Sequence, residues 1–245
     1  MSMAIPDIAT VLVVEDEPDL SELVTMEFSI RGHRTYTAHD GRQALSITRE
    51  QPVNLIVTDV RMPNMSGLEL LDTLKAEDPF NPAVIFISAY ADIELPEVYG
   101  RGAEGFFTKP FHLRSLAERA DCLLARQRAP WCEEAPLNSE GAPVRLEALR
   151  DGAKALLGRG GAGLVIPGFP LAHPDQRVRI AFSSTELGGA PIEGHGKVQW
   201  VHDTGESATE YGVEFEALYG NGRDQYMAWL ASARPIPYIP SSARG

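Results

Sequence analysis

Four short apolar runs within the first 109 residues constrain the fold of this chain most, because each run ends directly at polar residues. The runs are VLVV, LIVT, VIFI and GFFT, and segments with helical spacing separate them. Runs of this kind, rich in β-branched and aromatic side chains, are typical of parallel strands buried on both faces. In such a sheet, ligands bind at the carboxyl ends of the strands. We therefore expect a doubly wound α/β sheet with one site along these ends.

The polar residues at the four run ends suit the acceptance of a phosphoryl group. They are Glu15, Asp16, Asp59, Ser88 and Lys109. Three carboxylates packed together repel one another unless a hard cation neutralises them, and their oxygens are ligands suited to Mg²⁺. Lys109 and the Ser88 hydroxyl would bind the oxygens of the phosphoryl group. Asp59 is the expected nucleophile, since carboxylates form aspartyl-phosphates. A strand end often carries one ordinary polar residue, but five suitable residues at four ends favour a site.

Residues 9 to about 128 resemble a response-regulator receiver domain. The resemblance is carried by VVEDEPDL after the first run, TDVRMPNMSGLELL around Asp59, ISAY at the third run and FFTKPF at the fourth. It implies a flavodoxin-like fold with a five-stranded parallel sheet. It also implies that Asp59 receives a phosphoryl group from a sensor histidine kinase, with Mg²⁺ as cofactor.

The same resemblance assigns roles to individual residues. Asp16 and Asp59 would be direct metal ligands, Glu15 would act nearby or through water, and the backbone carbonyl of Arg61 would complete the metal shell. Ser88 and Phe106 fall on the switch pair of the family. Phosphate would draw the hydroxyl toward it, and the aromatic ring would turn inward to fill the vacated space.

Two bulky residues bear on the lifetime of the phosphoryl group. Arg61 lies two residues after the nucleophile, and Tyr90 lies two residues after Ser88. Both should flank the path of the attacking water, and attack is sensitive to small displacements. If they shield the acyl phosphate, the signal should last minutes or longer. The alternative is that both side chains point to solvent.

Composition favours a two-domain protein in the cytoplasm. The chain has 245 residues, which leaves a second segment large enough for its own core. The apolar runs are strand-sized and the N-terminus has no signal-peptide pattern, so we expect no membrane insertion. Two cysteines, Cys122 and Cys132, are too few for a disulfide framework.

Charge argues against DNA as a partner. Residues 1–128 hold 12 Lys+Arg and 20 Asp+Glu, a net charge of −8, and the rest hold 10 and 14, a net of −4, which together give the total of −12. Nucleic-acid-binding domains carry a clustered basic face, and neither half has one.

Changes in pattern predict the domain boundaries. We expect a receiver domain over 1–128, a linker over 129–143 rich in Pro, Ala and acidic residues, a second domain over 144–237 and a tail over 238–245. The last helix of the receiver should begin near Phe111 and end near residue 128. Pro96 should confine the preceding helix to the residues after it. Residues 144–157 fit either an amphipathic helix or a strand followed by a turn.

Beyond Gly158 the pattern is that of short β-strands. AGLVI, QRVRIAF, GHGKVQWVHD and YGVEFEAL alternate in part and are divided by Gly and Pro, which predicts a small antiparallel barrel or sandwich. A helix, RDQYMAWLASA, should close one end. The order of these segments resembles a PilZ domain, a barrel family that binds cyclic di-GMP.

The ligand-binding motifs of that family are incomplete in this chain. The family carries RxxxR, but Arg145 and Arg150 are five residues apart here. Its (D/N)xSxxG motif aligns with GRGGAG, in which only Gly163 agrees. Candidate nucleotide-binding residues are therefore Arg145, Arg150, Arg159 and Gly163. The glycine loop could cradle phosphate or form a tight turn between strands. Because lost polar partners cost several factors of ten in affinity, we expect cyclic di-GMP binding to be weak or absent.

Three functions follow from these observations. The first is a two-component response regulator that signals through a PilZ-like output domain by protein–protein contact, with an unidentified downstream protein and a possible homodimer. The second is a two-input sensor whose PilZ domain also binds cyclic di-GMP. The third, an enzyme in the second domain, is disfavoured because no Ser/His/Asp set or metal cluster occurs after residue 129. We favour the first, without enzymatic activity other than self-phosphorylation and self-dephosphorylation at Asp59.

Overall fold

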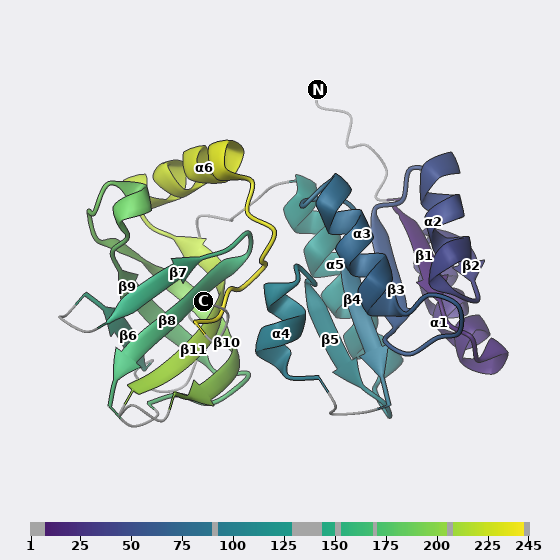
Figure 1. Ribbon diagram of the computed structural model, residues 1–245, viewed down its shortest axis with the longest axis horizontal. Coiled ribbons are helices and arrows are strands. Elements are labelled where there is room, and N and C mark those ends of the chain that lie inside the picture. The colour runs from purple at the N-terminus through teal and green to yellow at the C-terminus, as the bar shows by residue number, and fades with distance from the viewer. Residues whose placement is uncertain are drawn as a thin grey trace. The chain divides into compact units, whose positions relative to one another are not determined.

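The computed structural model describes residues 8–89, 93–128, 144–149, 153–168, 171–204 and 208–242. Tyr90, Arg150 and the predicted linker over 129–143 lie outside these residues. The chain forms two compact units, shown in Figure 1. The first unit contains residues 1–93 and 101–128, and the second contains residues 94–100 and 129–245.

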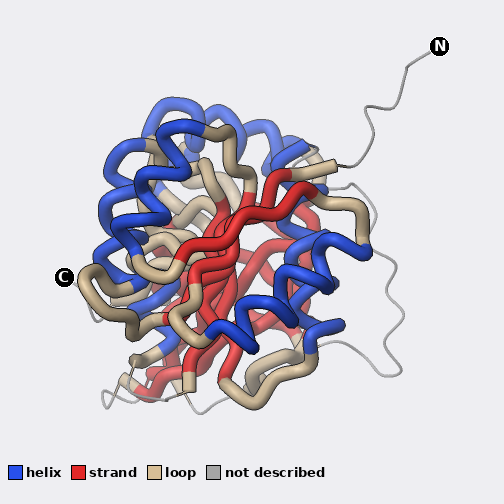
Figure 2. Tube along the Cα trace, turned by 90° about the vertical axis from the view of Figure 1, so that its right-hand side faces the viewer, coloured by secondary structure: helices blue, strands red, loops and turns tan. Residues whose placement is uncertain are grey.

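The first unit is the predicted five-stranded parallel sheet with flanking helices. Its strand order is β2-β1-β3-β4-β5. Helix α1 packs beside α5 and α2 beside α3, and Figure 2 shows helices on both sides of the strands. The strands are β1 (Thr10–Val14), β2 (Arg34–Ala38), β3 (Leu55–Asp59), β4 (Ala83–Ser88) and β5 (Gly105–Thr108), and the helices are α1 (Pro18–Ile30), α2 (Gly41–Glu50), α3 (Gly67–Glu77) and α5 (Leu113–Arg128).

Burial explains why the apolar runs become the central strands. Every residue of β1, β3 and β4 is buried, because helices cover both faces of the sheet. The last helix begins at Leu113, two residues after the predicted start, and its face of Leu116, Ala120 and Leu123 is buried as the spacing predicts. The sheet thus provides a rigid support for the residues at its strand ends.

The second unit is built on a six-stranded sheet with the order β6-β9-β10-β11-β8-β7. Residues 144–157 form two strands, so the strand alternative for this segment is correct and the helix alternative is wrong. Helix α6 covers one end of the sheet (Figure 1). The elements are β6 (Arg145–Ala148), β7 (Lys154–Leu157), β8 (Gly161–Pro167), β9 (Arg177–Phe182), the short 3₁₀ helix η1 (Thr185–Leu187), β10 (Ile192–Asp203), β11 (Ala208–Leu218) and α6 (Asn221–Ala233).

The prediction of an antiparallel barrel needs correction. β6 pairs with β9 in parallel, whereas the other four ladders are antiparallel. β6 and β7 are the two edge strands, and no ladder joins them within the described residues. The sheet is therefore a curled, mixed half-barrel. Between β6 and β9 the chain forms β7 and β8 at the opposite edge of the sheet, and β9 then pairs with β6 in parallel. A local alternation pattern does not reveal a pairing between strands so far apart in sequence.

The second sheet packs around a hydrophobic core that includes several aromatic rings. Val178, Ile180 and Phe182 of β9 are buried on the face that their alternation predicts. The rings of Phe182 and Phe215 stack with centroids 5.4 Å apart, and Tyr226 of α6 meets Phe215 edge to face at 5.3 Å. Such aromatic pairs add to the free energy gained from burial, so the closing helix is part of this core.

Two short segments complete the second unit. Helix α4 (Leu95–Gly100) has Pro96 in its first turn, where the missing N–H costs nothing. Although residues 94–100 lie between β4 and β5 in sequence, they pack with the second unit. The sequence pattern predicts a tail from residue 238 onward. In the structure the segment after Ile236 packs against the sheet through Ser242, and Tyr238 and Ile239 are buried. No helix in the described ranges is long and apolar enough to cross a membrane.

Candidate functional site

Three of the predicted site residues come together at the carboxyl ends of β1, β3 and β5. Asp59 is the last residue of β3, Glu15 follows β1, and Lys109 follows β5. The Lys109 ammonium donates hydrogen bonds to Asp59 Oδ2 at 2.7 Å and to Glu15 Oε2 at 2.9 Å. One cation thus lies between two carboxylates that are far apart in sequence.

Burial and the contacts between opposite charges shift the pKa values of Glu15 and Lys109 in opposite directions. The side chain of Glu15 is 1% exposed, and burial raises its pKa above the ordinary value, with Lys109 opposing the shift and Asp59 adding to it. Burial alone would lower the pKa of Lys109, but its hydrogen bonds to Asp59 and Glu15 outweigh burial and raise it. Lys109 therefore stays charged, and its charge is what allows two acidic groups to lie close together.

The backbone around Asp59 is held in place by its neighbours. The Arg61 amide donates to Asp59 Oδ1 at 3.1 Å, so both carboxylate oxygens are engaged. A side chain at Gly67 would place its Cβ 2.1 Å from the Asp59 carbonyl oxygen, so only glycine lets α3 begin so close to β3. Ser66 and Glu69 form a capping box that fixes the start of that helix.

The remaining receiver residues lie around this group. Ser88 ends β4, is buried, and accepts a hydrogen bond at its carbonyl from the Lys109 amide at 2.7 Å. Phe106 lies opposite Phe86 in the ladder of β4 and β5 and is half-buried. Asp16 is exposed on the loop after Glu15. The switch role of Ser88 and Phe106 stays a prediction.

The predicted shield of the phosphoryl group is only partly described. Arg61 is exposed, two residues after Asp59. Tyr90 lies outside the described residues. The expectation of a long-lived phosphoryl signal therefore stays a prediction.

The acidic residues fit a hard cation by their chemistry. In the part of the chain that is described, no group of three or more His, Cys, Asp and Glu side chains is arranged to hold a metal ion. Instead, Lys109 joins the carboxylates of Glu15 and Asp59. Carboxylate oxygens are nevertheless the ligands that Mg²⁺ prefers, so the donor type agrees with the predicted cofactor.

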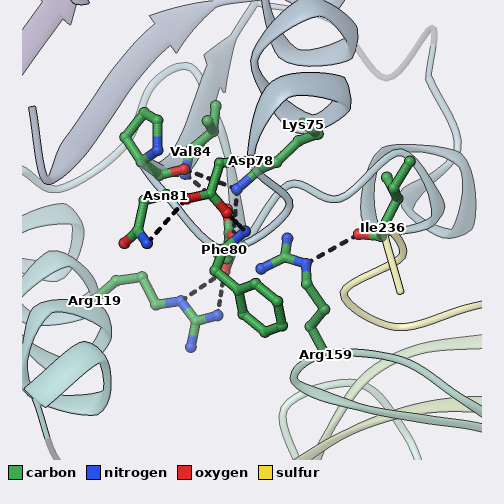
Figure 3. Close-up of polar contacts among 10 residues, drawn as sticks. Lys75, Asp78, Phe80, Asn81, Val84, Arg119, Arg159 and Ile236 are labelled. Atoms are coloured by element: carbon green, nitrogen blue, oxygen red, sulfur yellow. Dashed lines mark hydrogen bonds and ion pairs between the residues drawn. The ribbon is translucent and has the colours of Figure 1, made fainter. Parts of the chain in front are cut away.

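Three of the four candidate nucleotide-binding residues, Arg145, Arg159 and Gly163, lie in the described part of the second unit and contact other residues of that unit. Arg145 is exposed and pairs with Glu147 at 2.7 Å and with Glu193 at 3.5 Å. Arg159 is buried, and its Nε donates to the Ile236 carbonyl at 3.0 Å (Figure 3). Arg145 is the first residue of edge strand β6, and Arg159 lies in the turn after β7, the strand at the opposite edge of the sheet. The structure thus does not join them in a pair.

The glycine loop is a turn that other parts of the unit cover. It connects the antiparallel strands β7 and β8, and the Gly158 amide donates to the Gly161 carbonyl at 2.9 Å. The hydroxyl of Tyr226 donates to the Gly158 carbonyl. A Cβ on Gly163 would lie 2.2 Å from the Pro240 carbonyl oxygen. These contacts favour the tight-turn interpretation over a phosphate cradle.

Sequence reasoning missed two buried glutamates on β11. Glu210 and Glu214 are almost fully buried and accept hydrogen bonds from the C-terminal segment. The sequence signal was three glutamates, at positions 210, 214 and 216, on one side of a mostly apolar strand, and such a pattern resembles an ordinary strand with one face toward solvent.

Comparison with known proteins defines the class of the first unit. A family model described as "Response regulator receiver domain" matches residues 11–121. Together with the parallel sheet and the carboxylates at its strand ends, this match shows that the chain contains a response-regulator receiver domain of two-component signalling. Receiver domains bind Mg²⁺ at their phosphorylation site.

The chain is also similar to individual proteins and solved structures. The chain is 37% identical over 117 residues to the "Probable transcriptional regulatory protein TcrX" of Mycobacterium tuberculosis, covering 48% of this chain and 50% of that protein. It is 29% identical over 194 residues to the "Response regulator protein PilR" of Pseudomonas aeruginosa, covering 74% of this chain and 43% of that protein. A solved structure, the Francisella response regulator 1452 receiver domain, is 31% identical with a TM-score of 0.46, covering 49% of this chain and 98% of the other.

The chain spans about half the length of the curated relatives it matches. The family match ends at residue 121. The resemblance of the second unit to PilZ domains therefore rests on the sequence pattern, and the activity of the whole protein is a matter for proposal.

Proposed function

We propose that this protein is a two-component response regulator that accepts a phosphoryl group from a sensor histidine kinase on Asp59 and signals through its second unit. The observation that carries the proposal is the Lys109 ammonium between Asp59 and Glu15. A buried carboxylate beside a fixed ammonium at a strand end combines a nucleophile with a charge that stabilises phosphoryl oxygens.

The chemistry at Asp59 is a single transfer. A carboxylate oxygen of Asp59 forms a new bond to phosphorus, and the bond between phosphorus and the kinase histidine nitrogen breaks. Lys109, already within hydrogen-bond distance of Asp59, offsets the negative charge of the transferred group. Ser88 binds one of its oxygens, and Phe106 turns inward in response.

Mg²⁺ is the cofactor of this proposal. Glu15, Asp16, Asp59 and the backbone carbonyl of Arg61 would hold it, and when bound it neutralises charge on the phosphoryl oxygens. Two of these residues are buried carboxylates, which supports a site for a hard cation. Asp16 is exposed beside them, where it can reach an ion from solvent.

We propose that the second unit acts by contact with a downstream protein rather than on DNA or cyclic di-GMP. Several relatives are named transcriptional regulators, but this chain has a net charge of −12, which opposes binding to DNA. The packing of Arg159 and Gly163 against the C-terminal segment leaves neither free to read a dinucleotide.

Phosphorylation of the purified full chain tests the proposal. Acetyl phosphate with Mg²⁺ should add one phosphoryl group, detected by intact mass, and Asp59→Asn should abolish the addition. Asp19→Asn, an exposed carboxylate on α1, is the matched control and should be phosphorylated normally. Equal phosphorylation of Asp59→Asn would overturn the assignment of the nucleophile.

A further inference from the structure

The C-terminal segment Ile236–Ser242, which we call the strap, lies against the turn between β7 and β8. The Arg159 amide donates to the Pro237 carbonyl at 2.8 Å, and the Gly160 amide donates to the Tyr238 carbonyl at 2.9 Å. These backbone contacts hold the first half of the strap against the glycine loop.

Buried glutamates of β11 hold the strap further along. The Tyr238 hydroxyl donates to Glu214 at 2.6 Å. Glu210 accepts from the Ser241 hydroxyl at 3.0 Å and from the Ser242 amide at 2.5 Å. A buried carboxylate without a donor is costly, so the strap supplies partners that the sheet itself needs.

Glycines create the space in which the strap lies. A Cβ on Gly160 would lie 2.0 Å from the Tyr238 ring, and one on Gly158 would lie 2.5 Å from the Tyr238 carbonyl oxygen. Larger residues would exclude the strap. The groove and the segment that fills it are therefore shaped for each other.

Tyr238 also contacts helix α4 within the second unit. The Tyr238 amide donates to the Tyr99 carbonyl at 2.9 Å, and the two rings stack with centroids 6.3 Å apart. Both tyrosines are buried. Helix α4 lies inside the span matched to the receiver family, yet it packs with the second unit.

A side-chain network joins the two tyrosines a second time. The Tyr99 hydroxyl donates to Gln199 Oε1 at 3.3 Å, and Gln199 Nε2 donates to Glu214 Oε2 at 2.6 Å. Glu214 in turn accepts from Tyr238. Because the hydrogen bonds of such a network strengthen one another, we expect α4 and the strap either to remain packed on the second sheet together or to detach from it together.

We propose that the strap is a latch that retains helix α4 in the second unit, and that phosphorylation of Asp59 releases α4 and the strap together. The second part rests on the proposed function. Ser88 ends the strand that leads along the chain to α4, so a shift of this residue toward a phosphoryl group can bias the position of the helix. The latched and released states form the two-state equilibrium that phosphorylation would shift.

Hydrogen exchange of the full chain, followed by mass spectrometry, tests the latch itself. Tyr238→Ala should accelerate exchange of residues 95–100 about tenfold, within the range typical of coupled sites. Ile236→Ala is the control, because this side chain is exposed and its carbonyl still accepts from Arg159. Unchanged exchange of α4 in Tyr238→Ala, with the sheet folded, would overturn the latch.

Beryllofluoride with Mg²⁺, a mimic of the aspartyl phosphate, tests the control by phosphorylation. It should accelerate exchange in α4 and in the strap of the wild type, but not of Asp59→Asn. By reciprocity, Tyr238→Ala should bind beryllofluoride more tightly, about tenfold. Protection near Asp59 without any change in α4 or the strap would overturn phosphorylation-dependent release alone. No response of any segment would overturn the proposed phosphoacceptor, while Tyr238→Ala would still decide the latch.

Discussion

Lys109 Nζ lies 2.7 Å from Asp59 Oδ2, although Asp59 ends β3, Lys109 follows β5 and two helices separate the two residues in sequence. The same ammonium also contacts Glu15. This arrangement links the stability of the first unit to its proposed chemistry, because one positive charge both holds two carboxylates together and faces the proposed nucleophile.

Lys109→Gln should slow phosphorylation of Asp59 by acetyl phosphate about 100-fold or more, because a charge aimed at the phosphoryl oxygens is lost. The rate of mass increase in the full chain measures this effect. Arg114→Gln removes an exposed positive charge on α5 and should leave the rate unchanged. A similar loss of rate in both variants would mean that net charge, and not the position of Lys109, matters.

Glu15 should make the stability of the protein depend on pH. Burial raises its pKa above the ordinary value of 4.5, so the folded chain binds this proton more tightly than the unfolded chain. Its favourable contribution is complete below pH 4.5 and is lost as the pH rises through the raised pKa. Glu15→Gln should therefore gain stability relative to wild type between pH 4.5 and neutral pH, measured by urea unfolding. A gap between wild type and variant that does not change with pH would contradict this.

A buried ion pair should contribute strongly to the stability of the first unit. Lys75 donates to Glu104 at 2.8 Å and to the Pro82 carbonyl at 2.7 Å, and both side chains are at most 4% exposed (Figure 3). Lys75→Met should cost about 3–5 kcal/mol, because it leaves a buried carboxylate without its cation. Urea unfolding measures the loss. Adding Glu104→Gln to Lys75→Met should restore part of it, and full additivity of the two changes would contradict direct coupling.

Gly160→Ala should destabilise the second unit by about 1–3 kcal/mol, because the new methyl group would overlap the Tyr238 ring. Thermal unfolding provides the measurement. The double variant with Tyr238→Ala removes the overlapping ring, so Gly160→Ala should cost less in that background. An equal cost in both backgrounds would mean that the backbone, and not the strap, requires glycine.

Calorimetric titration of the full chain with cyclic di-GMP should give no heat, with or without beryllofluoride and Mg²⁺. The reason is that Arg159 and Gly163 are engaged by the C-terminal segment and Arg145 by acidic neighbours. Micromolar binding would support the two-input sensor instead.

Much of the first unit could be predicted from sequence because its signals are local. The apolar runs, their length and the polar residues that end them predict parallel strands and a shared edge, and Asp59 and Lys109 meet there. The helix over Leu113–Arg128 follows from its spacing alone. The second unit was less predictable, since β6 pairs in parallel with β9 across residues distant in sequence.

By itself, then, the sequence determined the parallel sheet and the meeting of carboxylates and lysine at its strand ends, because burial on two faces and strand direction leave one arrangement for such runs. Only the tertiary structure showed why glycines follow β7 and why Glu214 is buried: the glycines leave space for Tyr238, and Glu214 accepts a hydrogen bond from its hydroxyl. It also decided that Tyr99 packs with the second unit. These contacts depend on shape and on hydrogen bonds between segments far apart in the chain, and periodicity carries no information about either.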